Sequence, residues 1–408
     1  MQPASATDVH ATVANFLAAS REPVVIEPGE DPIAIGSDNF VLSGPSTRPI
    51  LECWSTTKNL TRRIAGIHAE KRGKLDLVTE HFGGKRGRLL LLDAAHPSNS
   101  LAGRRTDRLK YREQFRLALH RQYPDWRIVE LSTEPDLEHT LSPAYPRALL
   151  RKGTSAMAAI GASYDCGDPD GALSFGLIWL DYLRQREPRL SIGGLLIFLP
   201  IGGEINTCHR VRYLDSKRAQ VIVFVHGPGG IEEAVHPEDY TNFTTRVELP
   251  GLIRPHPQTP EAVLEAHVRA DVQSIDGTLL TNPVYSQAIH SAAGTRGIMD
   301  LLAVDFQGRL AILELKASED LHLPLQALDY WMRVCWHLER GDFARAGYFP
   351  GLAIRPEPPR ILLVAPALQF HSTTETILGF LSSNLQVECL GLGLEWRREL
   401  KVAFRACR

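Results

Sequence analysis

Two apolar runs near the C-terminal end of the chain constrain its fold more than any other feature. Residues 298–304 (IMDLLAV) and residues 310–317 (LAILELKA) are separated by DFQGR, a polar segment with a glycine that is typical of a turn. This spacing predicts an antiparallel hairpin. Because the second run is apolar on both faces as far as Glu314, we expect its strand to be central in a sheet and covered on both sides.

Three charged residues interrupt or end this hairpin. Side chains on a strand alternate between faces, so Glu314 and Lys316 should project to the same side, and Asp300 can reach that side from the paired strand. One interpretation is an ordinary ion pair at the solvated end of a strand, worth less than about 1 kcal/mol. The other is a functional site, because an unpaired carboxylate within an apolar strand costs several kcal/mol or shifts its pKa.

The elements predicted around the hairpin form an α/β pattern with helices packed on a mixed sheet. A helix is expected over residues 261–274 and a strand over residues 284–290, both before the hairpin. A helix over residues 324–339, a strand over 360–368, a helix over 372–383 and a strand over 386–394 should follow. Gln326 and Tyr330 are four residues apart in the first of these later helices, so they face the same way.

Taken together, Asp300, the triplet Glu314-Leu315-Lys316 and the pair Gln326 and Tyr330 resemble the motifs of the PD-(D/E)XK nuclease superfamily, in particular its RecB-like members with a Q-x-x-x-Y element. The resemblance covers residues 255–408 and implies a restriction-endonuclease-like αβββαβ core. The first core helix of this superfamily often supplies a further acidic ligand. Glu265 is favoured for that role here and Glu261 is the alternative. One departure is Met299, which stands where many members have a proline before the aspartate.

The resemblance also implies an activity, that of a Mg²⁺- or Mn²⁺-dependent nuclease that hydrolyses phosphodiester bonds, with DNA favoured over RNA and a role in defence or repair. Lys316 would orient the attacking water. Gln326 and Tyr330 would position the nucleic acid or brace the lysine, unless they only pack their helix. The alternative is a catalytically silent nucleic-acid-binding or interaction protein on a nuclease-like scaffold. The metal ligands implied by the family are Asp300, Glu314, Glu265 and the backbone carbonyl of Leu315.

The rest of the chain should form separate domains, because 408 residues exceed one ordinary core. Four prolines within residues 249–262 predict a linker. We therefore expect a β-rich region over residues 1–150, which begins with a helix at residues 8–19 and contains a basic helix at residues 104–122. A small α+β unit should cover residues 151–250, with a strand at residues 208–215 among others. The predicted nuclease-like domain over 255–408 completes the chain.

The basic helix belongs to the most positively charged part of the chain. Residues 58–127 hold 17 Lys and Arg against 7 Asp and Glu, although the whole chain has a formal net charge of −2. A basic segment of this kind predicts contact with a phosphate backbone. The arginines that recur at helical spacing are Arg104, Arg108, Arg112 and Arg116. Their alternative role is a solvated helix face, and the adjacent stripe of Tyr111, Phe115 and Leu119 is expected to be core.

Composition and short motifs limit the classes of protein to which this chain can belong. No apolar run approaches the length of a membrane span, and the N-terminal residues show no secretory signal. Six cysteines without a C-x-x-C pair exclude a zinc ribbon and favour a reducing, cytoplasmic setting. The glycine-rich stretches lack the Gly-Lys-Ser/Thr ending of a P-loop. The sequence leaves open whether the chain forms a homodimer and whether it binds a protein partner.

Overall fold

The computed structural model describes the chain with several gaps, and it divides into two compact units. The described residues are 8–27, 33–55, 59–71, 73–80, 86–95, 102–136, 140–163, 166–227, 232–240, 245–247, 260–286, 289–291 and 300–407. Unit 1 comprises residues 1–55, 59–241 and 293–295, and unit 2 comprises residues 56–58, 242–292 and 296–408. Each unit has its own sheets and is described by itself.

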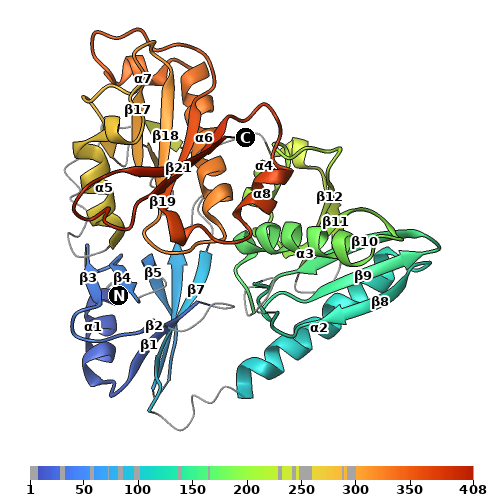
Figure 1. The fold of residues 1–408 in the computed structure, drawn as a ribbon. Coiled ribbons are helices and arrows are strands. Elements are labelled where there is room, and N and C mark those ends of the chain that lie inside the picture. Colours follow the sequence, from blue (N-terminus) through green and yellow to red (C-terminus); the bar gives the residue numbers. More distant parts are fainter. Residues whose placement is uncertain are drawn as a thin grey trace. The chain divides into compact units, whose positions relative to one another are not determined.

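The first part of unit 1 is a seven-stranded antiparallel sheet with one helix on it, shown in blue in Figure 1. Strands run in the order β2-β1-β7-β6-β5-β4-β3. Their bounds are α1 Val9–Ala19, β1 Pro23–Ile26, β2 Ile33–Ala34, β3 Phe40–Ser43, β4 Ile50–Trp54, β5 Asn59–Lys71, β6 Lys74–Glu80 and β7 Arg86–Asp93. Every second residue of the central strands, such as Leu75 and Leu77, joins Val13 of α1 in one buried core. The opposite face of β5, β6 and β7 carries polar side chains.

The second part of unit 1 is a six-stranded sheet in the order β13-β12-β11-β10-β9-β8. Its middle strands β10, β11 and β12 are parallel, and the outer pairs are antiparallel. The bounds are α2 Ala102–Gln122, β8 Arg127–Ser132, β9 Arg147–Lys152, β10 Ser155–Gly161, η2 Pro169–Gly171, α3 Ala172–Arg186, β11 Ser191–Pro200, α4 Ile205–Val211, β12 Gln220–His226, β13 Glu232–Val235 and η3 Pro237–Asp239. Helices α2 and α3 cover opposite faces (Figure 1), because Phe115 of α2 packs near Leu196 while Gly176 of α3 meets the neighbouring Leu195.

Unit 2 is built on a mixed six-stranded sheet in the order β15-β17-β18-β19-β20-β21, beside a small β14-β16 pair. Strands β18, β19 and β20 are parallel, and the other neighbours are antiparallel. The helices are α5 Pro260–Ala270, η4 Val272–Ser274, α6 Leu323–Glu339, α7 Asp342–Arg345, η5 Ala367–Gln369 and α8 Thr374–Phe380. The strands are β14 Thr245–Val247, β15 Tyr285–Ser286, β16 Ile289–Ser291, β17 Leu301–Val304, β18 Leu310–Leu315, β19 Arg360–Pro366, β20 Val387–Leu392 and β21 Val402–Cys407.

The predicted mixed α/β organisation is confirmed, and so is the central hairpin, in which Leu301 pairs with Leu313 and Val304 with Leu310. The prediction of a strand over residues 208–215 is wrong, because helix α4 covers the first half of that segment and no strand follows in the second half, which the structure describes in full. The predicted boundary between residues 150 and 151 falls within strand β9. Among the helices of the described residues, none combines the length and the apolar character that crossing a membrane requires.

Candidate functional site

The candidate site lies at the end of the β17–β18 hairpin in unit 2. Asp300 immediately precedes β17, and the register of the pair brings it beside the strand that ends at Leu315. The backbone N–H of Leu315 donates a 2.7 Å hydrogen bond to Asp300 Oδ2. Leu313 and Leu315 belong to the core on the α5 face, so the Glu314 side chain points to the other face of the sheet. The two predicted carboxylates therefore share one end of the hairpin.

Glu314 is held in an environment that opposes its ionisation. The residue is only 2% exposed, and its Oε2 atom is buried without a hydrogen-bond donor. Burial, reinforced by the negative charge of Asp300, raises the pKa of Glu314 well above its usual range. A positive charge close to the Glu314 carboxylate would lower that pKa again.

Lys316 supplies one such charge, and it is shared. Its Nζ atom lies 3.9 Å from Glu314 Oε1 and 3.5 Å from Asp320 Oδ2. The first distance confirms that Glu314 and Lys316 project to the same side. Burial alone would lower the pKa of the ammonium, but the carboxylates of Asp320 and Glu314 outweigh it and raise the pKa above its ordinary value. Lys316 is therefore a permanent cation at neutral pH.

Asp320 was not foreseen from the sequence. The backbone N–H of His322, the N-cap residue of α6, donates a 2.8 Å hydrogen bond to Asp320 Oδ1. Burial opposes ionisation of Asp320, but Lys316 and His322 outweigh it, so its pKa is lowered. The only signal in the sequence is its position four residues after Lys316, in a loop where spacing does not fix which side chains meet.

Helix α5 brings two acidic side chains towards this group. Glu265 is 6% exposed, and its pKa is raised to about 7 by burial and by the charge of Asp300. Its Oε1 atom lies 3.9 Å from Arg269 Nη1 and accepts no hydrogen bond. Burial also raises the pKa of Glu261, which interacts with the charge of Lys316. Both helix residues considered from the sequence therefore feel the charges of the hairpin.

Helix α6 contributes Tyr330 from the other face of the sheet. Tyr330 is 9% exposed, and burial followed by the charge of Glu314 raises its pKa well above the usual range. The guanidinium of Arg333 lies 5.7 Å from the centre of its ring. Gln326 lies one turn earlier, and its Oε1 atom is buried without a hydrogen-bond partner. Tyr330 is thus placed beside the acidic group as a neutral phenol.

The chemistry of these side chains suits a hard divalent cation, although they do not form a ready-made cage. Within the described residues, no three His, Cys, Asp or Glu side chains lie close enough together to bind one metal ion as they stand. Asp300 Oδ2 is engaged by the Leu315 N–H, which helps to explain this. Even so, Glu314 and Glu265 each keep a buried oxygen without a donor, and oxygen ligands are those that Mg²⁺ prefers.

The arginines predicted to contact nucleic acid lie on α2 in unit 1. The side chain of Arg104 lies outside the described part of the structure, and Arg108 is partly buried. Arg112 has a buried Nε atom without a hydrogen-bond partner. Arg116 forms 2.6–3.0 Å hydrogen bonds to Glu113 on the same helix, which neutralises its charge locally. The predicted stripe is therefore weaker as a phosphate contact than four free guanidinium groups would be.

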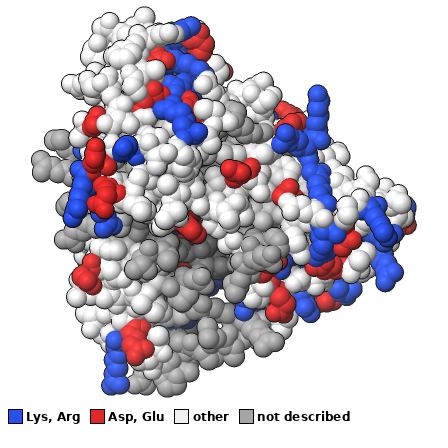
Figure 2. Space-filling view, in the orientation of Figure 1, with Lys and Arg blue, Asp and Glu red and all other residues white. Residues whose placement is uncertain are grey.

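The core stripe of the same helix is confirmed. Tyr111, Phe115 and Leu119 are buried, and Tyr111 donates a 2.6 Å hydrogen bond to the Ala162 carbonyl. On the face drawn in Figure 2, the coloured Lys and Arg side chains lie among Asp and Glu side chains and form no single continuous positive patch.

No family model matches this chain, and no match was found among the curated proteins or the solved structures.

Proposed function

We propose that unit 2 is a metal-dependent nuclease of the PD-(D/E)XK type that hydrolyses phosphodiester bonds. The observation that carries the proposal is a group of carboxylates whose charges act on Lys316, namely Asp320, Glu314, Asp300 and Glu261, in a largely buried setting. Burial, reinforced by the like charge of Asp300, raises the pKa values of Glu314 and Glu265. Strongly perturbed pKa values of this kind cluster at functional sites.

The order of elements around the site supports the same assignment. Around the six-stranded sheet of unit 2, helix α5 is followed by the strands β15, β17 and β18 and then by α6 and β19. This is the αβββαβ order that the resemblance implies. Strand β16, which lies between β15 and β17 in the chain, pairs with β14 instead, and the short helix α7 follows α6. Gln326 and Tyr330 lie on α6, directly after the hairpin that carries Asp300 and Glu314.

In this proposal Asp300, Glu314, Glu265 and the Leu315 carbonyl would hold Mg²⁺ or Mn²⁺. The bound ion would act as a Lewis acid and lower the pKa of a water molecule. Lys316 would contribute a positive charge towards the scissile phosphate, because its raised pKa keeps it protonated throughout the physiological range. Tyr330 would donate a hydrogen bond to the phosphate or to a carboxylate, because it stays un-ionised.

The substrate and the biological role are further parts of the proposal. DNA is favoured over RNA, and defence or repair is the setting that such chemistry serves. The N-terminal region would bind the substrate or a partner protein, through α2 or another basic group of unit 1. The supporting observation is the excess of Lys and Arg over residues 58–127.

A cleavage assay on single-site variants tests the proposal. Purified protein is incubated with single-stranded DNA, double-stranded DNA and RNA in Mg²⁺ or Mn²⁺, with EDTA as the blank. Asp300→Asn, Glu314→Gln and Lys316→Met should each lower the cleavage rate by at least about 100-fold, because each removes a charge that acts in the transition state. The matched control is Glu395→Gln, an exposed carboxylate of the same unit, which should leave the rate unchanged.

Two outcomes would contradict the assignment. Cleavage that survives all three variants would come from a contaminant or another site. Salt-sensitive nucleic-acid binding without cleavage of any substrate would favour the catalytically silent alternative. The observation that supports this alternative is that the described residues include no ready-made three-ligand group. Calorimetric titration with Mn²⁺ then measures metal binding directly. If the proposal holds, Asp300→Asn should bind Mn²⁺ more weakly than the unmodified protein.

A further inference from the structure

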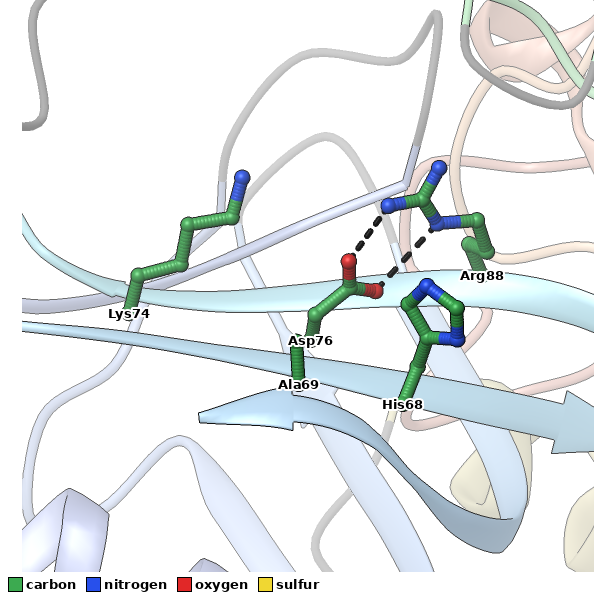
Figure 3. A pocket seen from close by; sticks show the side chains of 5 residues that line it. All are labelled: His68, Ala69, Lys74, Asp76 and Arg88. Atoms are coloured by element: carbon green, nitrogen blue, oxygen red, sulfur yellow. Dashed lines mark hydrogen bonds and ion pairs between the residues drawn. The ribbon is translucent and has the colours of Figure 1, made fainter. Parts of the chain in front are cut away.

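A second polar site lies on the seven-stranded sheet of unit 1. It is a hollow of about 210 Å³ lined by His68, Ala69, Lys74, Asp76 and Arg88 (Figure 3). Leu75 and Leu77 of β6 point into the α1 core, so Lys74 and Asp76 lie on the opposite face of the sheet. The hollow is therefore separate from the hydrophobic core of this sheet.

The floor of the hollow is a fixed ion pair. Asp76 is only 4% exposed, and both of its carboxylate oxygens accept hydrogen bonds from Arg88, with Nε 3.3 Å from Oδ1 and Nη2 bonded to Oδ2. Arg88 stands on β7 opposite Val78, so the pair bridges neighbouring strands. A bidentate pair of this kind fixes the plane of the guanidinium. Figure 3 shows the pair and Lys74 rising from the same side of the sheet.

The walls of the hollow add positive charge. Lys74 has no hydrogen-bond or ion-pair partner among the described residues, so its ammonium is available to a ligand. His68 is exposed and lies at the register shift between Ile67 and Ala69, a bulge that redirects its side chain. With Asp76 and Arg88 compensating each other, Lys74 gives the hollow a net charge of about +1.

We propose that this hollow binds a phosphate group. The Lys74 ammonium calls for an acceptor, and the tetrahedral phosphate accepts hydrogen bonds from several directions at once, including from an imidazole N–H. The hollow also lies in the most basic part of the chain, residues 58–127. The phosphate could belong to a small phosphate compound or to a nucleic-acid backbone, and the chemistry is the same. None of the proposed nuclease residues lines the hollow, so the test of this site does not depend on the proposed nuclease function.

The test measures binding of two probes to the full chain in EDTA, where metal-dependent cleavage cannot interfere. Inorganic phosphate is titrated by calorimetry, and a fluorescein-labelled 20-nucleotide DNA by polarisation. Lys74→Ala removes the available ammonium and leaves the buried Asp76–Arg88 pair intact, so the sheet should keep its fold. The matched control is Lys217→Ala, an exposed lysine of the same unit.

We expect Lys74→Ala to weaken at least one probe about tenfold, as for the loss of one charged hydrogen bond. A loss for both probes identifies a small phosphate that DNA also mimics. A loss for DNA alone identifies the backbone, and its binding should then depend less steeply on salt by about one phosphate contact. Failure of both probes to bind, or equal binding by Lys74→Ala and Lys217→Ala, would overturn the proposal.

Discussion

Replacing Glu265 by glutamine should change how the stability of unit 2 depends on pH. The pKa of Glu265 is raised from about 4.5 to about 7 by burial and by Asp300. A raised carboxyl pKa means that the folded state favours the protonated form. The contribution of Glu265 to the free energy of unfolding is therefore greatest below pH 4.5 and is lost as the pH rises from 4.5 through 7.

The magnitude follows from the size of the shift. A difference of about 2.5 pKa units corresponds to about 3 kcal/mol of differential stability, of which about 2–3 kcal/mol is lost between pH 5 and pH 8. Glutamine cannot ionise, so Glu265→Gln removes this loss. An unsatisfied amide in the variant would add a constant destabilisation of about 1–2 kcal/mol at every pH, which leaves the slope unaffected.

Urea unfolding in EDTA, followed by circular dichroism at pH 5, 6, 7 and 8, measures the effect. The stability difference between Glu265→Gln and the unmodified protein should shift in favour of the variant by about 2–3 kcal/mol from pH 5 to pH 8. Glu395→Gln, on the surface of the same unit, should show no such trend. Asp300→Asn should reduce the trend in part, since burial remains. Parallel pH curves for Glu265→Gln and the unmodified protein would refute the reasoning.

Two further predictions concern Asp320 and a turn glycine. Asp320→Asn should slow cleavage about tenfold, because Lys316 loses the nearer of its two carboxylate partners and is held less firmly, while Asp320→Glu should restore part of the rate. Cleavage by Asp320→Asn at the rate of the unmodified protein would rule out this positioning role. Gly308→Ala should lower the stability by about 2–4 kcal/mol, because Gly308 has φ of +90° and an added Cβ would lie 2.2 Å from the Ala353 carbonyl oxygen. Thermal unfolding beside Gly277→Ala, where a Cβ would meet nothing within 4 Å, measures this, and equal melting temperatures would contradict it.

Where periodicity and burial agree, the sequence was sufficient to predict elements of unit 2, but the single strand expected over residues 284–290 is two short strands, β15 and β16, in different sheets. The hairpin of β17 and β18 follows from two apolar runs around a polar turn, and α6 begins and ends within a residue of the predicted helix. The helix stripe of Phe115 and Leu119 in unit 1 was predicted on the same basis. In each case the hydrophobic pattern alone decides which face is buried.

Where burial of polar groups decides the structure, the sequence was not sufficient. Residues 208–215 alternate as a strand would, yet α4 forms there, because buried polar side chains such as Asn206 and Arg210 find partners in the Asp170 turn. Asp320 lies in a loop, and its contact with Lys316 depends on how that loop closes. The contacts of α4 with Asp170 join residues far apart in the sequence, and the contact of Asp320 with Lys316 depends on the conformation of a loop. Hydrophobic periodicity predicts neither kind of contact.

The proposed cation would complete the balance of charge at the hairpin. Lys316 is closer to Asp320 than to Glu314, so its single charge is shared, and Arg269 lies 3.9 Å from Glu265. A pair selected for stability would give each buried carboxylate oxygen a donor, since buried unpaired charge is costly. Instead, Glu314 and Glu265 each keep a buried oxygen without a donor, and burial together with the charge of Asp300 raises their pKa values. A bound cation, as proposed for this site, would supply the positive charge that these oxygens lack.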